Sequence, residues 1–496
     1  MNTELMEFYE EYKAKVSAYE FVFTSLHFDL DTIAPKDGNA YANEVCSIFE
    51  GEYFSYATAP ENIERIEALV KETEDSKLKK ELSLRLRSLH QISKLPKEVY
   101  VDFQNLTTEG SQYWEEAKEK NDFQIFKPHL LKIIKKKKEM MTYFDVQGSD
   151  YDYMLDEFEQ GMTREKYDEF FAKVKEKLIP LIRRIKESGR KIDTSALEKT
   201  YDVNGQKEFM KVIREVLQMD ERKCYISESA HPFCSFFSTN DVRFTTRYVT
   251  EHLTGAILST IHEYGHALYG LQLNPAYEKT TFESEIGSAM HESQSRLLEN
   301  NIGRTKEFWQ VPYPKLQEIF PQQLGEVTLE HFVDMINATT PSFIRVDADE
   351  LTYPLHIVIR YELEKAIFDG TADLESLDVL WADKYEEYLG IRPETYQEGI
   401  LQDIHWSCGY FGYFPTYALG SAFAAQFYHQ MEKELEIGKL LEEGKIHEIV
   451  KWLGEKIHQY GASKTYSKLL VDVTGEEFNP DYYINYLVEK YERMYF

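Results

Sequence analysis

Apolar residues recur at helical spacing through the first 220 residues, with charged residues between them. Segments 60–93 and 164–188 are clear examples, because apolar positions three and four residues apart alternate with Glu, Lys and Arg. This pattern predicts a series of amphipathic helices. No internal repeat or low-complexity linker separates these helices from the rest of the chain. We therefore expect a single domain over residues 1–496, in which a helical half (1–220) covers a catalytic half (221–496).

The pattern changes between residues 224 and 250. The stretches CYISES (224–229) and HPFCSFFSTNDVRFTTRYVT (231–250) alternate with a period of two and are rich in aromatic and β-branched residues. With the turn signal Ser-Thr-Asn-Asp at 238–241, they predict a small antiparallel hairpin. The helical pattern then resumes and continues to the C-terminus. The expected fold class is mainly α, with a small antiparallel β element just before a helix within residues 251–273.

That helix carries the sequence HEYGH at residues 262–266. Positions i and i+4 lie on the same face of a helix, so His262 and His266 can direct imidazole nitrogens at one point. This spacing is typical of a zinc site, in which Glu263 acts on a metal-bound water without binding the metal. The alternative is that His262 and His266 are two ordinary histidines on a buried helix. Residues elsewhere in the chain must show whether a metal site can be completed.

A catalytic zinc ion needs a third protein ligand. A third histidine at HExxHxxGxxH spacing is excluded, because Tyr269 and Gln272 occupy the Gly and His positions. The segment 287–304 has a helical pattern and carries Glu292, 26 residues after His266, which leaves room for a turn and a second packed helix. We expect Glu292 to be the third ligand, with Glu299 as the alternative on the same face. The hairpin strand beside the metal helix could pair with an extended peptide and hold its carbonyl near the metal.

Composition narrows the function classes. A formal net charge of −29 argues against nucleic acid and against anionic membrane surfaces. No apolar run is long enough to span a bilayer, and the N-terminus lacks the apolar core of a signal peptide. The four cysteines are scattered without CxxC spacing, so we expect buried thiols and neither disulfides nor a thiolate metal site. These features predict a cytoplasmic protein.

Basic side chains suggest where a substrate carboxylate binds. The segment FIRVDADELTYPLH (343–356) contains Arg345, and a guanidinium offers two parallel donors to a free carboxylate. Arg345 could equally form a structural ion pair with the nearby acids. Arg243 and Arg247 in the hairpin are competing candidates.

The segment GILQDIHWSCGYFGYFPTYALGS (399–421) clusters a histidine with several tyrosines. Neutral donors of this kind can stabilise the oxyanion that develops when a carbonyl is attacked. His405 and either Tyr410 or Tyr417 are the candidates. We expect Tyr413 to pack in an aromatic core.

Six motifs in order, HPF (231–233), DVRFT (241–245), HEYGH, HESQ (291–294), IRVDAD (344–349) and GILQDIHW (399–406), resemble those of the carboxypeptidase Taq family of zinc metallopeptidases. The resemblance covers essentially the whole chain. It implies a mostly helical, thermolysin-like zincin with a long substrate groove, usually a homodimer. By motif position it makes His262, His266 and Glu292 the ligands and Glu263 the catalytic acid and base. We also place His231 and Asp349, from two of these motifs, at the substrate-binding site.

The expected activity is the release of single amino acids from the C-termini of peptides, with one Zn²⁺ per chain that Co²⁺ can replace. The expected partners are peptides with a free C-terminal carboxylate. One alternative is an oligopeptidase or dipeptidyl-type enzyme of the same zincin class. Another, from a different class, is an inactive zinc-stabilised protein that binds peptides; Glu263 argues against it, because a structural site needs no such residue.

Overall fold

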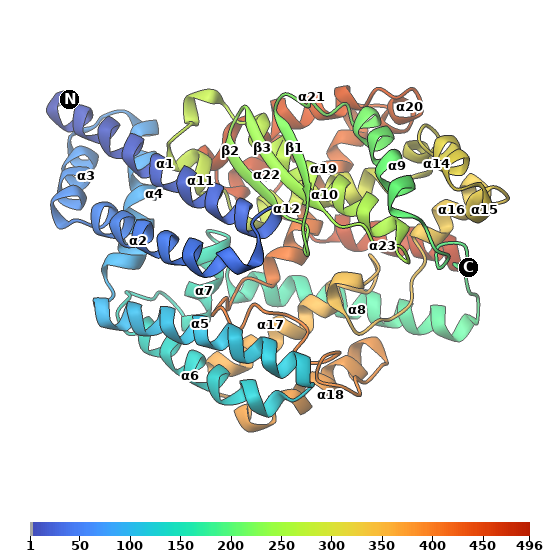
Figure 1. Ribbon diagram of the computed structural model, residues 1–496, viewed down its shortest axis with the longest axis horizontal. Helices are drawn as coiled ribbons and strands as arrows, with labels where there is room; N and C mark the ends of the chain where they lie inside the picture. Colours follow the sequence, from blue (N-terminus) through green and yellow to red (C-terminus); the bar gives the residue numbers. More distant parts are fainter. Residues whose placement is uncertain (1–2) are drawn as a thin grey trace.

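The first half of the chain forms helices, as its amphipathic pattern predicts (Figure 1). The computed structural model describes residues 3–496. Segment 60–93 is two helices and not one, because Asp75 accepts hydrogen bonds from the backbone N–H groups of Lys77 and Leu78 and starts a new helix there. The elements of this half are α1 (Thr3–Thr32), η1 (Lys36–Gly38), α2 (Asn39–Ala57), α3 (Pro60–Glu72), α4 (Ser76–Ser93), α5 (Lys97–Lys120), α6 (Phe123–Met141), α7 (Asp150–Phe158), α8 (Arg164–Ser188) and α9 (Val203–Val216).

Three short strands follow, and they form one sheet in the order β1–β3–β2. The strands are β1 (Cys224–Glu228), β2 (Cys234–Ser238) and β3 (Asp241–Thr246). The predicted antiparallel hairpin is confirmed as β2 and β3. The sheet as a whole is mixed, however, since β1 pairs in parallel with β3. Alternation of side chains predicts that a segment is a strand but says nothing about its partner, so the parallel pairing was missed.

The helical pattern resumes after the sheet. Short 3₁₀ turns connect several of the helices, and η3 is a π-helix that continues α12. These elements are α10 (Leu253–Leu271), η2 (Pro275–Tyr277), α11 (Thr281–Ser284), α12 (Ser288–Arg296), η3 (Leu297–Ile302), α13 (Lys306–Trp309), α14 (Tyr313–Ile319), α15 (Pro321–Leu324), α16 (Leu329–Ile336), η4 (Arg345–Asp347), α17 (Tyr353–Asp369), η5 (Leu374–Ser376), α18 (Leu377–Leu389), α19 (Pro415–Glu434), α20 (Ile437–Glu442), α21 (Ile446–Lys456), η6 (His458–Ser463), α22 (Tyr466–Thr474) and α23 (Asp481–Tyr495).

One large hydrophobic core extends from Leu95 to Tyr495 and includes side chains of α5 to α9 as well as of the later helices. Because the two halves share this core, we retain the proposal of a single domain. The helix α12 packs between α10 and α19 near the centre of the molecule (Figure 1). No helix in residues 3–496 has the length and apolarity needed to cross a membrane.

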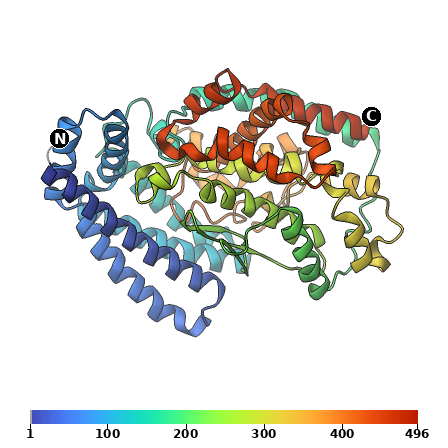
Figure 2. The ribbon, with the colours of Figure 1, turned by 90° about the horizontal axis from the view of Figure 1, so that it is seen from above.

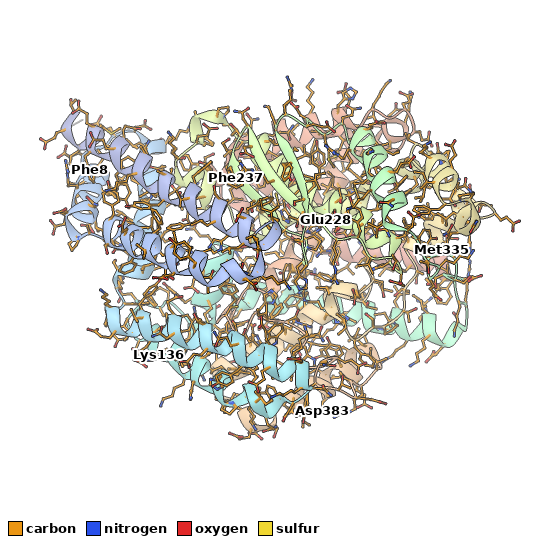
Figure 3. All side chains as sticks on the ribbon, in the orientation of Figure 1. Phe8, Lys136, Glu228, Phe237, Met335 and Asp383 are labelled. Atoms are coloured by element: carbon orange, nitrogen blue, oxygen red, sulfur yellow. The ribbon has the colours of Figure 1, made fainter. Side chains whose placement is uncertain are left out.

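Helices α1 to α4 have a smaller core of their own. Figure 2 shows α1 and α2 as a long hairpin along one side of the molecule. Near its free end, α1 packs on the sheet through aromatic pairs: the ring centroids of Phe21 and Phe237 are 5.4 Å apart, and those of Phe28 and Phe233 are 5.8 Å apart. Phe237 is labelled in Figure 3, where α1 crosses the sheet. Helix α1 of this hairpin therefore packs on one face of the sheet.

Candidate metal centre

The three predicted ligands converge in a partly buried site. His262 and His266 lie on α10, and Glu292 lies on α12. Glu292 Oε2 is 3.7 Å from His262 Nε2 and 3.4 Å from His266 Nε2. Two N and O ligands of a tetrahedral zinc ion are separated by about 3.4 Å. The donor set and its spacing therefore fit a divalent ion such as Zn²⁺.

Two glycines allow the helices to approach this closely. A Cβ atom on Gly265, inside the HEYGH sequence, would lie 2.5 Å from the backbone Cα of Ser295 on α12. A Cβ atom on Gly420 of α19 would lie 2.6 Å from Glu292 Cγ. Both distances are shorter than any ordinary carbon–carbon contact. Glycine at these positions brings Glu292 within reach of the two histidines.

A carboxylate orients the first histidine. Glu299 Oε2 is 2.9 Å from His262 Nδ1 and leaves Nε2 free to face the metal position. This is the usual second partner of a metal-binding histidine. The geometry therefore favours Glu299 as the group that orients His262 and Glu292 as the ligand. Arg296 contacts both carboxylates, at 2.7 Å from Glu292 and 3.2 Å from Glu299.

The second histidine is oriented by a residue whose role the sequence did not reveal. His266 Nδ1 lies 2.6 Å from His291 Nδ1. Burial lowers the pKa of His291 to about 3, and the neighbouring His266 and His458 add to the effect. A neutral His291 can accept the hydrogen bond from His266 Nδ1–H, which leaves His266 Nε2 free to face the candidate metal position. In the sequence, only the position of His291 next to Glu292 indicated that His291 lies near the metal site.

Burial and the surrounding charges shift the pKa values of Glu292 and Glu263 in opposite directions. Burial acts to raise the pKa of Glu292, but Arg296 and the two histidines outweigh it and hold that pKa well below its ordinary value. Burial raises the pKa of Glu263, with Glu292 and Glu299 adding to the rise and His262 and His266 opposing it. Glu292 is thus held as an anion, as a ligand must be, while Glu263 has the higher proton affinity expected of a general base.

The predicted oxyanion donors are only partly brought together. His405 Nε2 is 3.3 Å from the Tyr417 hydroxyl. Burial raises the pKa of Tyr417, and the charge of Glu292 adds a smaller contribution. Tyr413, expected in an aromatic core, stacks on His405 with ring centroids 5.6 Å apart and also feels the Glu292 charge. Tyr410 is 53% exposed and packs against Phe158 and Tyr413, without a direct contact to His405 or Tyr417. Burial lowers the pKa of His405 to about 4, so its imidazole is neutral at pH 7.

Arg345 is buried beside this cluster. Its Nε and Nη2 atoms donate to Asp403 Oδ1 at 3.0 and 2.9 Å, and its guanidinium lies 5.0 Å from the Tyr417 ring centroid. Arg360 donates to the other oxygen of Asp403 at 2.7 Å. The partner of Arg345 is thus Asp403, and the nearby acids that the sequence suggested are not involved. Two guanidinium groups share one carboxylate, which leaves a net positive charge.

The remaining predicted substrate residues lie elsewhere. The Asp349 carboxylate accepts hydrogen bonds from Thr339, Thr340, Leu351 and Thr352, so it organises its own loop. Arg243 is held by Asp241 and lies over the Phe237 ring. His231 and Arg247 are exposed in the loop before β2 and just after β3, where Arg247 donates to the carbonyl of Ala230. None of these four contacts the metal-ligand group in the described structure, and their substrate-binding roles stay predictions.

A cavity of about 580 Å³ opens beside His291. Its walls come from α1, from β2, from the end of α10 and from the segment that follows α10, and they include Phe21, Phe236, Phe237 and Gly270. Glu20, Glu278 and Glu283 give it an acidic lining, with Arg85 as a basic residue. The cavity thus lies between the edge strand β2 and His291, the residue that contacts the candidate ligand His266.

A buried carboxyl fixes the start of α12. Glu159 Oε2 accepts hydrogen bonds from the backbone N–H groups of Ala289 and Met290, at 2.8 and 3.1 Å. Burial raises the pKa of Glu159 to about 7, although these two N–H groups oppose the rise. In an unfolded chain, the pKa of glutamic acid is about 4.3. Between these values the folded protein binds the extra proton, so its stability falls as the pH rises.

Replacing Glu159 with glutamine should remove this fall, because the amide oxygen can still accept both hydrogen bonds and never ionises. The variant should match the wild type near pH 4 and exceed it by on the order of 3 kcal/mol at pH 8. Thermal denaturation midpoints of both proteins between pH 4 and 8 measure the difference. Glu165→Gln, at an exposed site on α8, is the control. A pH-independent difference between Glu159→Gln and wild type would contradict the assignment.

Comparisons with known proteins agree with this geometry. The profile of the carboxypeptidase Taq (M32) metallopeptidase family matches residues 8–491. Carboxypeptidase 1 of Bacillus subtilis is 41% identical over 498 residues, which covers 100% of this chain and 99% of that protein. Thermostable carboxypeptidase 1 of Thermus thermophilus is 37% identical over 81% of this chain and 80% of its own length. A solved structure of a Pyrococcus furiosus carboxypeptidase superposes with a TM-score of 0.95 at 32% identity, covering 99% of each chain. The chain therefore belongs to the carboxypeptidase Taq (M32) metallopeptidase family and is a metallocarboxypeptidase, as its motifs predicted.

Proposed function

We propose that the protein removes single residues from peptide C-termini with a zinc ion held by His262, His266 and Glu292. One observation carries this proposal: ligand atoms of the three residues lie within 4.8 Å of one another. The buried Glu263 lies beside them, on the same helix as the two histidines. When bound, a zinc ion would act as a Lewis acid and lower the pKa of a coordinated water to about 7. The chain's own residues would supply the remaining steps.

Glu263 takes the proton from the attacking water and returns it to the departing amine. A general base is most effective when its pKa approaches the working pH, and the raised pKa of Glu263 supports this role. His291 and Glu299 keep the two histidine ligands in the orientation that leaves their Nε2 atoms facing the metal position.

His405 and Tyr417 donate hydrogen bonds to the oxyanion. Their 3.3 Å separation and neutral charge states support this role, because neutral donors fixed in place cost no reorganisation during the reaction. Tyr413 is a further donor candidate, since it stacks on the same histidine. The exposed position of Tyr410 makes it the weaker of the two tyrosines predicted from the sequence.

Arg345 binds the substrate's C-terminal carboxylate. It adjoins Tyr417, and the shared Asp403 neutralises only one of the two guanidinium groups, so the cluster can accept one more anion. Arg243 is already paired with Asp241, and Arg247 is exposed, which makes both weaker candidates. The upstream part of the peptide lies in the cavity beside β2, whose acidic lining suits neutral or cationic side chains.

Amidating the C-terminus of a peptide substrate tests this assignment. Loss of the carboxylate should lower kcat/KM by about 10- to 100-fold, because charge-assisted hydrogen bonds to Arg345 are lost. The measurement compares free-acid and amidated forms of one peptide, both acetylated at the N-terminus so that only one charge differs. Mass spectrometry of the products should show successive losses of single residues. Equal rates, or release of dipeptides, would instead favour an oligopeptidase or dipeptidyl-type enzyme.

Three finer assignments also belong to this proposal. Zinc is the metal we propose, with cobalt able to replace it in a site of nitrogen and oxygen ligands. Homodimer formation follows from family resemblance alone. A cytoplasmic location follows from composition alone.

A further inference from the structure

A second group of side chains that could hold a metal ion lies on the α1–α2 hairpin, outside the catalytic centre. It includes a cysteine, although the lack of CxxC spacing had predicted no thiolate metal site. It consists of His27 on α1 with Cys46 and Glu50 on α2. One ligand atom from each residue lies within 4.8 Å of the other two. The Cys46 thiol donates a hydrogen bond to Glu50, with an S–O distance of 3.6 Å.

This geometry fits a tetrahedral ion. In a zinc site the thiolate and carboxylate ligands lie about 2.3 and 2.1 Å from the metal, so their sulfur and oxygen atoms are about 3.5 Å apart. Cys46 and Glu50 are four residues apart and share one face of α2, while His27 approaches from the antiparallel α1. Cys46 is only 5% exposed, whereas His27 and Glu50 are exposed. An ion can therefore enter from solvent, and a water molecule can complete the coordination.

Two other roles for Cys46 fit less well. Burial and the neighbouring Glu50 raise the pKa of the Cys46 thiol, and a thiol with a raised pKa is a poor nucleophile and resists oxidation. A role limited to core packing would account for Cys46 but not for the His27 and Glu50 side chains beside it.

We propose that His27, Cys46 and Glu50 bind a second divalent ion of borderline or soft character, such as Zn²⁺ or Cd²⁺. The thiolate selects for such ions over Mg²⁺ and Ca²⁺. The ion cross-links α1 to α2 next to Phe28, which packs on the sheet, and one helical turn from Thr24, which lines the cavity. It fixes the hairpin whose helix α1 packs on the sheet. This site is independent of the proposed catalytic function.

The thiolate ligand gives the site a spectroscopic signal that the catalytic centre cannot produce. The full-length protein, stripped of metal by chelator, is titrated with Cd²⁺, and the sulfur-to-cadmium charge-transfer absorption is recorded in the ultraviolet. We expect this absorption to saturate at one equivalent per chain above the amount bound by His262, His266 and Glu292. Zinc-loaded wild type should contain two ions per chain by elemental analysis.

Variants assign the signal to this cluster. Cys46→Ser should abolish the absorption and reduce the zinc content to one ion per chain, whereas Cys408→Ser, which removes a thiol elsewhere, should change neither. His27→Ala and Glu50→Gln should each weaken Cd²⁺ binding by on the order of tenfold or more. Circular dichroism checks that the variants fold. An absorption that survives in Cys46→Ser, or its absence in a folded wild-type protein, would overturn the proposal.

Discussion

Replacing Glu263 with glutamine should lower kcat by about 10³-fold and leave the metal content unchanged. The amide has the size of the carboxyl group and fits the same buried position, but it cannot take a proton from the attacking water. Glu263 is absent from the group of converging ligand atoms, so its loss removes no bond to the metal. Glu263 is itself buried, so few solvent molecules can reach its position and replace the missing base.

Two measurements separate this effect from a loss of structure. Steady-state kinetics on a free-acid peptide give kcat, and elemental analysis of the same preparation gives the zinc content. Glu362→Gln is the matched control: it makes the same substitution on α17, where Glu362 pairs with Lys175 and Lys384. It should keep nearly full activity. A Glu263→Gln enzyme with more than about one tenth of wild-type activity would exclude Glu263 as the base, since general-base catalysis contributes at least about 10²-fold.

The parts of the site that the sequence predicted depend on local geometry. Helical spacing alone places His262 and His266 on one face, and the helical pattern of segment 287–304 makes Glu292 and Glu299 the candidates for the third ligand. The sequence predicted Glu292, with Glu299 as the alternative, and the structure adds a geometric reason for that order. The helix changes to π geometry at Leu297, directly after Arg296, and Glu299 contacts His262 from within that π-helix. No sequence pattern signalled this change.

Contacts between residues far apart in the chain were not predictable. Of the two roles considered for Arg345, the structural one paired it with an acid of its own segment, but its partner Asp403 lies 58 residues away, in the segment that also carries His405. Tyr413 was expected to serve only packing because aromatic residues cluster around it, and its stacking on His405 depends on how the irregular segment before α19 folds back on itself. The parallel pairing of β1 with β3 is another case. Each of these depends on tertiary packing, which a single sequence does not encode in a form that spacing rules can recover.

Zinc affinities of two variants can show whether Glu292 or Glu299 is the third metal ligand. Glu292→Gln should weaken zinc binding by about 10³-fold or more, because an amide oxygen is a poor substitute for a carboxylate ligand. The variant should still fold, because Arg296 keeps Glu299 as a charged partner at 3.2 Å. The amide oxygen of the new glutamine can also accept the hydrogen bond that Arg296 Nε–H now donates to Glu292. Competition with a chelator of known affinity measures the change, and peptide hydrolysis should fall with metal occupancy.

Glu299→Gln is the discriminating control because it removes the other candidate carboxylate from the same buried cluster. If Glu299 only orients His262, its loss should weaken zinc binding by about 10- to 100-fold, clearly less than the loss of Glu292. Excess zinc should then restore most of the activity of Glu299→Gln and little of the activity of Glu292→Gln. The reverse order of affinities would make Glu299 the third ligand, and the 3.4 Å approach of Glu292 to His266 would then need another explanation.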